Sequence, residues 1–161
     1  MAKVLLINPS KWGRGITAIW IPSHVAALRG AGHEVKLFDC TFYKKWTVDE
    51  ISFNTANQQY RPTDYYSYVK YNENDVVVDL QKACDEFKPD LIIWSAVSSH
   101  IHGEGEYVNV QYGYELVDQI KTSAVKVTAG LQITAQKEKV FERFPKLDAV
   151  IAGESELALA E

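Results

Sequence analysis

The chain has 161 residues, of which 47% are hydrophobic and 24% are charged, a composition typical of a globular domain large enough to bury a core. The net charge of −4 argues against a nucleic-acid-binding surface, because such a surface needs a basic patch. No apolar run is long enough to span a membrane. The two cysteines, Cys40 and Cys84, lack metal-site spacing and fit the reducing cytoplasm, so we expect no metal site within this chain.

Five short runs with strand character alternate with helical segments. The expected strands cover residues 3–7, 34–38, 91–95, 125–129 and 149–152. Most of them are continuous apolar runs, which are typical of strands buried on both faces of a parallel sheet. The expected helices cover residues 22–30, 75–87, 110–121 and 135–144.

This alternation predicts a doubly wound α/β fold with helices on both faces of the sheet. Five strands and no sixth favour the flavodoxin-like strand order 2-1-3-4-5 over the six-stranded dinucleotide fold. Because the crossovers are right-handed, all loops that follow strands lie at one edge of the sheet. We expect the ligand at this carboxyl edge.

Residues 41–74 form a long insertion between the second strand and the second helix. The insertion contains nine of the nineteen aromatic residues, whereas disordered linkers are poor in aromatics. We therefore expect it to be ordered. One interpretation is a small satellite core over the sheet edge, and the other is a lid or a docking surface for a ligand or partner domain.

The first loop, residues 8–15, follows a buried strand and precedes a helix, which is where such a sheet binds its ligand. It contains no Asp, His or Cys, so we expect it to hold a ligand by its shape and backbone. Four other segments reach the same edge. They are the chain at Asp39 and residues 95–106, 129–133 and 153–156.

Two other kinds of site are weaker matches. Gly13 and Gly15, with Asp39 after the second strand, match a dinucleotide fingerprint only in part. His100 and His102 form an H-x-H pair in a Gly-containing loop, where no third metal ligand is evident and a polar loop over the site is the simpler interpretation. No nucleophile with a base and an orienting group stands out, so we predict no catalytic residue.

A series of segments, taken in order, resembles one known family. The segments are residues 3–9 (KVLLINP), 27–35 (ALRGAGHEV) leading to Asp39, 89–93 (PDLII) leading to Ser95, Ala129-Gly130 and 148–156 (DAVIAGESE). The chain resembles the N-terminal cobalamin-binding domain of the cobalamin-dependent radical SAM enzymes. The resemblance covers nearly the whole chain, and it implies that residues 1–156 form a flavodoxin-like domain that binds cobalamin at the carboxyl edge of its sheet.

The first loop departs from the better-known cobalamin domains. Their D-x-H-x-x-G motif supplies a His to cobalt, but the matching positions here are Asn8, Ser10 and Gly13. The resemblance therefore implies cobalamin bound without a His from this loop. The cofactor-binding residues that it implies are Asn8, Pro9, Ser10, Trp12, Gly13, Gly15, Ser95, Val97, Ser98, Gly130, Leu131, Gln132, Gly153 and Glu154.

The radical SAM motif C-x-x-x-C-x-x-C is absent from the sequence. We expect residues 157–161 to begin a helix that connects to a C-terminal radical SAM domain, which would hold S-adenosylmethionine and an iron–sulfur cluster and would be the partner of this domain. On this interpretation the chain is the non-catalytic cofactor-binding part of a methyltransferase-like enzyme. Two alternatives stay open: a stand-alone flavodoxin-like nucleotide-binding or regulatory module, and a nucleotide-dependent enzyme that uses Gly13, Gly15 and Asp39.

Overall fold

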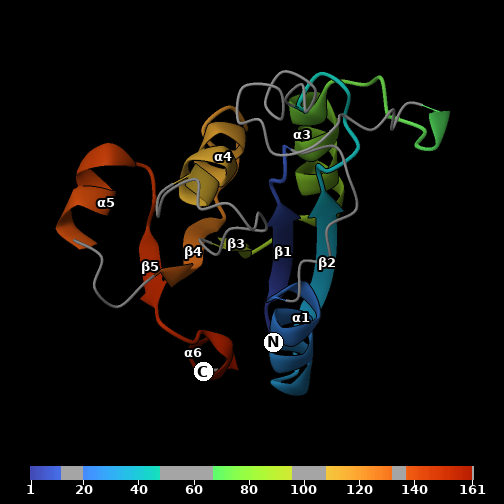
Figure 1. The fold of residues 1–161 in the computed structure, drawn as a ribbon. Coiled ribbons are helices and arrows are strands. Elements are labelled where there is room, and N and C mark those ends of the chain that lie inside the picture. The colour runs from blue at the N-terminus through green and yellow to red at the C-terminus, as the bar shows by residue number, and fades with distance from the viewer. Residues whose placement is uncertain (12–19, 48–66, 96–107, 132–136, 161) are drawn as a thin grey trace.

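The computed structural model describes residues 1–11, 20–47, 67–95, 108–131 and 137–160. Five strands form one parallel sheet in the predicted order, β2-β1-β3-β4-β5 (Figure 1). The strands are β1 (Lys3–Asn8), β2 (Glu34–Asp39), β3 (Leu91–Ser95), β4 (Val125–Leu131) and β5 (Ala149–Ala152). The helices are α1 (Trp20–Gly30), α3 (Val76–Phe87), α4 (Val108–Val117), α5 (Lys137–Arg143) and α6 (Glu156–Ala160). This arrangement confirms the flavodoxin-like α/β fold class.

Strand β1 lies between β2 and β3 and is buried on both faces. Leu5 and Ile7 point into a core shared with α3, α4 and α5. Val4 and Leu6 point into a second core on the opposite face, which α1 and α6 cover. Alternate residues of a strand face opposite sides of the sheet, so a continuous apolar run needs helices on both sides. The first strand therefore dictates the two-layer helical covering.

Helix α3 begins and ends where the sequence predicts. The carboxylate of Asp75 accepts hydrogen bonds from the amides of Val77 and Val78 at 2.8 and 3.2 Å, which caps the first turn. At the other end, Lys88 adopts a left-handed conformation with φ 53°, and its amide donates to the carbonyl of Cys84. Both ends are thus fixed by local hydrogen bonds of the kind that sequence patterns can indicate.

Several element boundaries differ from the sequence prediction. Strands β1 and β2 each extend one residue further, to Asn8 and Asp39, and β4 extends to Leu131. Helix α4 ends at Val117 rather than near residue 121. It stops early because the side-chain amide of Gln119 donates to the carbonyl of Glu115, which the next helical turn would otherwise satisfy.

The two described ends of the 41–74 insertion lie side by side. Tyr43 and Asn72 form a parallel bridge, and the amide of Asn72 donates to the carbonyl of Phe42 at 2.7 Å. The Tyr43 hydroxyl donates to Asp79 of α3 at 3.0 Å, and its ring packs against the core. These contacts tie the described ends of the insertion to the core, and the choice between a satellite core and a lid stays a prediction. Four other aromatic residues of the insertion lie outside the described residues: Phe53, Tyr60, Tyr65 and Tyr66. Their role stays a prediction.

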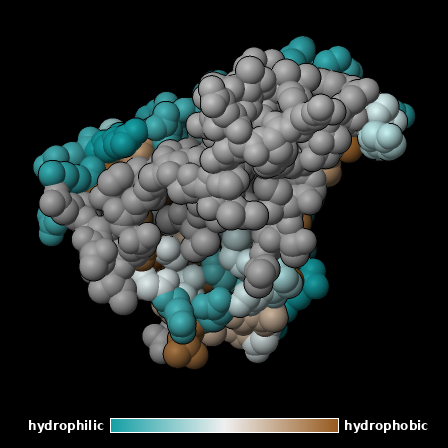
Figure 2. All heavy atoms as spheres, viewed as in Figure 1, coloured by the Kyte–Doolittle hydropathy of each residue, from teal (hydrophilic) through white to brown (hydrophobic). Residues whose placement is uncertain are grey.

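The surface seen in Figure 2 is hydrophilic along its upper margin, and a hydrophobic area lies at its lower end near α6. Leu157 of α6 is 84% exposed. No helix in the described ranges combines the length and the apolar character that crossing a bilayer demands.

Helix α4 packs closely on β3 through one glycine. Trp94 of β3 is fully buried, and its indole N–H donates to the carbonyl of Val110 at 3.2 Å. Gly113 lies one turn further along α4, and a Cβ atom added there would overlap the indole ring. The hydrogen bond and the surrounding core prevent the ring from moving away, so only glycine fits at this position.

Replacing Gly113 with Ala should therefore destabilise the domain. Overpacking a core costs about 1–3 kcal/mol, which exceeds the helix-propensity gain of roughly 1 kcal/mol. The measurement is the free energy of unfolding in urea. Gly30→Ala is the matched control, because nothing lies within 4 Å of a Cβ at Gly30. Equal stability of the two variants would contradict this account of the contact.

Candidate functional site

The carboxyl edge of the sheet contains a topological switch point. Strands β1 and β3 are neighbours, but the chain continues from β1 to α1 on one face and from β3 to α4 on the other. The connections after these two strands therefore separate, and open α/β sheets bind ligands in the crevice that this separation creates. The described residues around the switch point define the candidate site.

Strands β1 and β2 end in a network of polar side chains. The side-chain amide of Asn8 donates to Asp39 Oδ1 at 3.0 Å and to Thr41 Oγ1 at 3.2 Å. Asp39 Oδ1 also accepts from the amide and the hydroxyl of Thr41, at 3.0 and 2.6 Å. Asn8 and Asp39 stand opposite each other in the strand register. This network fixes the end of β1 and explains why Asn8 is a strand residue rather than the first residue of a loop.

Two buried hydroxyl side chains lie at the ends of the two strands that flank the switch point. Ser10 follows β1 and is 6% exposed, and Ser95 is the last residue of β3 and is 1% exposed. Pro9, which lies between the end of β1 and Ser10, is also buried, and its carbonyl accepts a hydrogen bond from Trp46 Nε1 at 3.3 Å. The sequence-predicted residues Asn8, Pro9, Ser10 and Ser95 therefore come together at one edge.

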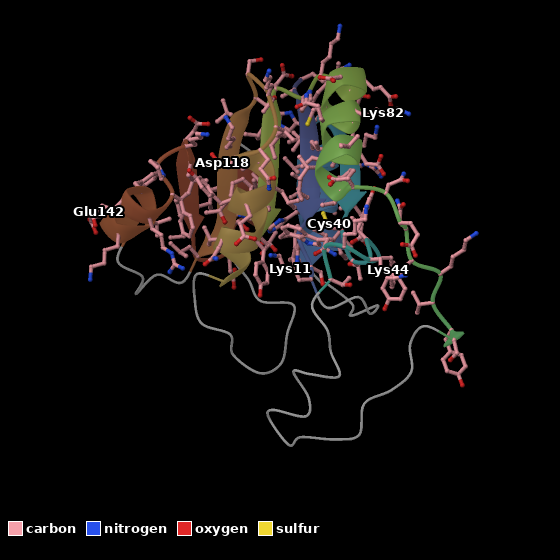
Figure 3. The ribbon with its side chains drawn as sticks, turned by 90° about the horizontal axis from the view of Figure 1, so that it is seen from above. Lys11, Cys40, Lys44, Lys82, Asp118 and Glu142 are labelled. Carbon is pink, nitrogen blue, oxygen red and sulfur yellow. The ribbon has the colours of Figure 1, made fainter. Side chains whose placement is uncertain are left out.

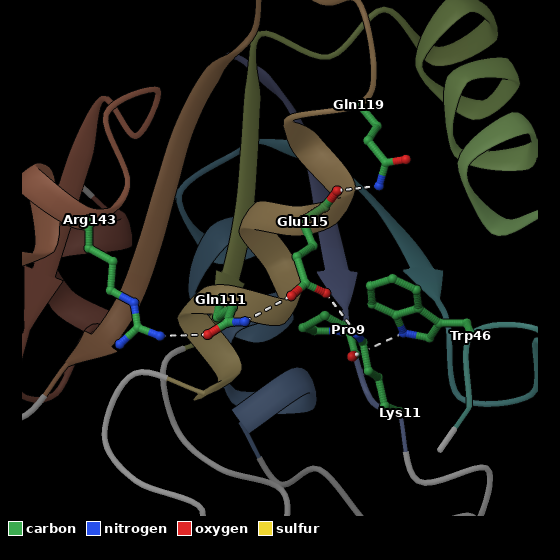
Figure 4. Close-up of polar contacts among 7 residues, drawn as sticks. All are labelled: Pro9, Lys11, Trp46, Gln111, Glu115, Gln119 and Arg143. Atoms are coloured by element: carbon green, nitrogen blue, oxygen red, sulfur yellow. Dashed lines mark hydrogen bonds and ion pairs between the residues drawn. The ribbon is translucent and has the colours of Figure 1, made fainter. Parts of the chain in front are cut away.

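Lys11 is held in a cage of aromatic and acidic side chains, of which Figure 4 shows Trp46 and Glu115. Its ammonium nitrogen lies 4.1 Å from the ring centroid of Trp46 and 4.6 Å from that of Tyr112. The same nitrogen donates to Glu115 Oε2 at 2.6 Å, and the Lys11 side chain is only 18% exposed. Aromatic faces and a carboxylate both stabilise a cation, so the lysine charge is satisfied within the protein.

A chain of hydrogen bonds holds Glu115, the acidic member of the cage, in place. Gln111 donates to Glu115 Oε1 at 2.9 Å and accepts from Arg143 at 2.6 Å. Lys11, Glu115 and Arg143 come from the end of β1, from α4 and from α5, respectively. Neither Glu115 oxygen is left without a donor. The start of the first loop is thereby tied to the helices on one face of the sheet.

A second set of polar contacts ties α1 to the chain after β5. His24 Nε2 lies 2.7 Å from Ser155 Oγ, and both side chains are buried, at 3% and 2% exposure. His24 Nδ1 has no hydrogen-bond partner among the described residues. Burial lowers the pKa of His24 below its usual value of 6.5, against the opposing effect of the negative charge of Glu156. The imidazole is therefore neutral at pH 7.

Ser23 supplies a parallel link, because its hydroxyl donates to Glu156 Oε1 at 2.6 Å. This hydrogen bond is the main reason that the pKa of the Glu156 carboxyl is lowered, and the amide of Glu156 itself adds to the effect. Glu156 lies in the first turn of α6, where the helix dipole favours a negative charge. The chain that follows the first loop, at α1, is thus anchored as well.

The thiols and the histidines of the described chain do not form a reactive centre. Burial raises the pKa of the Cys40 thiol well above its usual range, with a further contribution from the charge of Asp39. Burial also raises the pKa of Cys84, to about 11. His24 and Ser155 are hydrogen-bonded, but both are buried and Glu156 binds Ser23 rather than the imidazole. The described residues contain no cluster of His, Cys, Asp or Glu able to hold a metal ion.

The expected loop at residues 129–133 is wrong for Gly130 and Leu131, which extend the strand predicted over residues 125–129. Ala129, Gly130 and Leu131 belong to β4, and the pairing with β5 shifts register between Ala129 and Leu131. Gly130 has φ 80° and takes up this irregularity, whereas the Leu131 side chain is fully buried in the core. The Leu131 side chain therefore packs with the core instead of lining a loop.

The structure places the other predicted residues as follows. Gly153 follows β5 with φ 78° and its amide donates to the Leu131 carbonyl at 2.7 Å, while Glu154 is exposed. Their proposed contact with a ligand stays a prediction. Trp12, Gly13, Gly15, Val97, Ser98 and Gln132 lie outside the described residues, as do His100 and His102.

Sequence reasoning missed the anchoring roles of Lys11, His24 and Thr41. The contacts of Lys11 with Glu115 and of His24 with Ser155 join residues 104 and 131 positions apart. No local spacing could reveal such pairs. Thr41 carries a weak local signal, because an Asp followed two residues later by Thr can form a side-chain-capped turn.

The chain matches no protein-family model and no curated protein. Among solved structures, it is similar to an azoreductase from Bacillus anthracis, with 11% sequence identity and a TM-score of 0.42 over 94% of this chain and 85% of that chain. At this level the similarity supports no argument about function, and the fold assignment depends on the strand order described above.

The buried neutral His24 predicts a pH-dependent stability. Since the folded state lowers its pKa, unfolding takes up a proton at this residue, and stability should fall as the pH drops below about 6.5. The loss approaches about 1.4 kcal/mol per pH unit at most. The measurement is the urea unfolding free energy between pH 7.5 and about 5, above the range in which carboxylates with ordinary pKa values titrate.

His24→Gln should lose this pH dependence, because Gln can still bond to Ser155 but does not titrate. His33→Gln is the control, since His33 lies near the amino end of β1, where it accepts from the amide of Ala2. That variant should keep the pH dependence. An identical pH profile for wild type and His24→Gln would contradict the assignment.

Proposed function

We propose that this chain is a binding module that takes a cofactor or other small ligand at the carboxyl edge of its sheet, between β1 and β3. The observation that carries the proposal is the pair of buried hydroxyls, Ser10 and Ser95, at the two strand ends that flank the switch point. Both hydroxyls stand where such folds bind ligands, and a hydroxyl can both donate and accept a hydrogen bond there.

The ligand that we propose is cobalamin, held without a His from the first loop. The family resemblance supports this choice, and so does the chemistry of the edge. Ser10 and Ser95 offer hydroxyl groups, and Gly130 and Gly153 have positive φ angles and no Cβ, so a ligand can approach their backbone closely. These groups suit the amide side chains and nucleotide tail of cobalamin. Bound cobalamin would supply a cobalt centre able to carry a methyl group.

Imidazole ligation of cobalt has no support in the described residues. His24 is bonded to Ser155 within the α1–α6 interface, and His33 bonds to Ala2 near the amino end of β1. Asn8, at the position of the family's Asp, uses its amide to hold Asp39 and Thr41. This arrangement is compatible with the proposal that the first loop shapes one side of the pocket without coordinating the metal.

The charge at the start of the first loop also bears on the ligand. The Lys11 cation is satisfied by Glu115, and the exposed side chains of Asp39 and Glu154 near this edge are acidic. Among the described residues, such a balance favours a ligand whose phosphate charge is offset by a cationic metal centre over a more highly charged nucleotide.

The proposal includes a partner and a location. We propose that the module works with a radical SAM domain of the same protein, in the cytoplasm. The family resemblance supports that domain as the holder of S-adenosylmethionine and an iron–sulfur cluster. In this chain Cys40 and Cys84 are buried and lie far apart in sequence, so they do not form the cluster motif. The chain described here would then hold cobalamin for a methyltransferase-like reaction and would carry no catalytic residue itself.

The second candidate is a stand-alone nucleotide-binding or regulatory module, and one observation favours it. Asp39 stands at the end of β2, where related folds bind ribose hydroxyls, and its described hydrogen bonds all use Oδ1. Asp39 Oδ2 is therefore available to a diol. Asp39→Asn should weaken nucleotide binding and leave cobalamin binding unchanged.

The first test compares hydroxocobalamin, NAD and a sugar nucleotide as probes by isothermal titration and by the visible spectrum after gel filtration. We expect hydroxocobalamin to be retained, and Ser95→Ala to weaken its binding about 3- to 10-fold, the loss of one hydrogen bond of about 0.5–1.5 kcal/mol. Ser123→Ala, an exposed serine at the opposite edge, should bind as wild type does. Retention of a nucleotide but not of hydroxocobalamin would overturn the cobalamin proposal in favour of the nucleotide-binding module.

A narrower prediction concerns the face of the bound corrin. If the first loop does not coordinate cobalt, Ser10→Ala should leave the visible spectrum of bound cobalamin unchanged, because that spectrum reports the axial ligands. A large shift of its absorption bands would show that the loop reaches the metal. The melting temperature of Ser10→Ala, measured in parallel, separates this effect from loss of the fold.

A further inference from the structure

Lys11 has an unusual environment for a lysine. Lysine side chains are rarely buried unless paired, yet this one is 18% exposed and contacts two aromatic rings and a carboxylate. Lys44 and Lys82, which pair with Glu73 and Glu86, are far more exposed, at 47% and 73%. Lys126, paired with Asp148, is 17% exposed, but it contacts no aromatic ring among the described residues. Figure 3 shows Lys11 and Lys44 at the same end of the molecule, so position alone does not explain the difference.

Trp46 contacts the first loop twice. Its indole N–H donates to the carbonyl of Pro9, and its ring face receives the ammonium of Lys11. Because Trp46 belongs to the segment after β2, the end of β1 and that segment are joined through both a backbone acceptor and a side-chain cation. Glu115 adds α4 as a third element, at a distance of 2.6 Å. One lysine thus joins three segments that are remote in sequence.

These contacts lie next to the candidate ligand site without belonging to it. Lys11 follows the buried Ser10 directly, so its position fixes the backbone from which the Ser10 hydroxyl projects. The core of the sheet does not need the lysine, since Leu5, Ile7 and Trp94 are fully buried by apolar neighbours. The cage therefore sets the position of the loop start more than it sets the stability of the fold.

We infer that Lys11 is a positioning residue for ligand binding at the first loop, and that it couples the loop to Trp46. The first claim, that Lys11 positions the loop for ligand binding, rests on the proposed function. The second claim, that Lys11 couples the loop to Trp46, is independent of any ligand. The cation is needed for both, because only a positive charge is stabilised by the two ring faces and Glu115 together.

The experiment uses the full chain labelled with 5-fluorotryptophan, with the four fluorine resonances assigned by single Trp→Phe variants. Lys11→Met keeps most of the side-chain length and removes the charge, and Lys11→Arg restores a cation. Lys146→Met is the matched control, because it breaks an exposed ion pair with Asp118, just beyond the far end of α4. Glu115→Gln is a second variant that weakens the cage without changing Lys11.

We expect Lys11→Met to shift the Trp46 resonance, to leave that of the buried Trp94 in place, and to weaken hydroxocobalamin binding about 10-fold. Lys11→Arg should recover most of the binding, and Glu115→Gln should cause an intermediate loss. The melting temperature of Lys11→Met should stay close to that of Lys146→Met. This combination distinguishes positioning from a general loss of stability.

Two results would overturn the inference: an unchanged Trp46 resonance in Lys11→Met, or unchanged binding in that variant when the wild type binds. If the wild type binds neither hydroxocobalamin nor a nucleotide, the proposed function fails. The Trp46 resonance then still accepts or rejects the coupling between Lys11 and the segment after β2. The two failures are therefore distinguishable.

Discussion

The burial of β1 on both of its faces is the constraint on which the rest of the structure depends. Four consecutive apolar residues, Val4 to Ile7, must each be covered, and alternate ones face opposite sides of the sheet. Among the described residues, α1 and α6 on one face and α3, α4 and α5 on the other meet this need. Because the chain turns to opposite faces after β1 and after β3, the same constraint creates the switch point at the carboxyl edge. The burial of apolar side chains thereby determines the edge at which the candidate site lies, independently of its polar residues.

Polar contacts then fix the segments that leave this edge. On one face, Lys11, Trp46 and Glu115 hold the end of β1 to α4 and to the segment after β2. On the other face, the His24–Ser155 and Ser23–Glu156 pairs hold α1 to α6. The chain on either side of the first loop is therefore anchored to a different helical layer. Each anchor satisfies a charge or a buried polar group that would otherwise oppose folding.

The sequence predicts the sheet well because its evidence is local and strong. Apolar runs locate the strands, and Asp75 marks the start of α3 through hydrogen bonds to amides two and three residues away. Prediction from sequence fails where contacts between residues that are distant in sequence determine the structure. The end of α4 depends on the Gln119 side chain, the extension of β4 depends on pairing with β5, and the cage of Lys11 depends on residues about 35 and 100 positions away. The candidate site could thus be placed at an edge, but not assembled from particular contacts.

The bridge between Tyr43 and Asn72 makes the sheet tolerant of the length of the chain between them. The two residues are neighbours, so the bridge brings the two described ends of the insertion together. Closing a loop across such a fixed gap becomes only about 0.6 kcal/mol harder for each doubling of its length. The length of the chain between residues 47 and 67 can therefore change at little cost to the fold. For an engineer, the same pair of residues marks a place where a reporter or a second domain could be grafted.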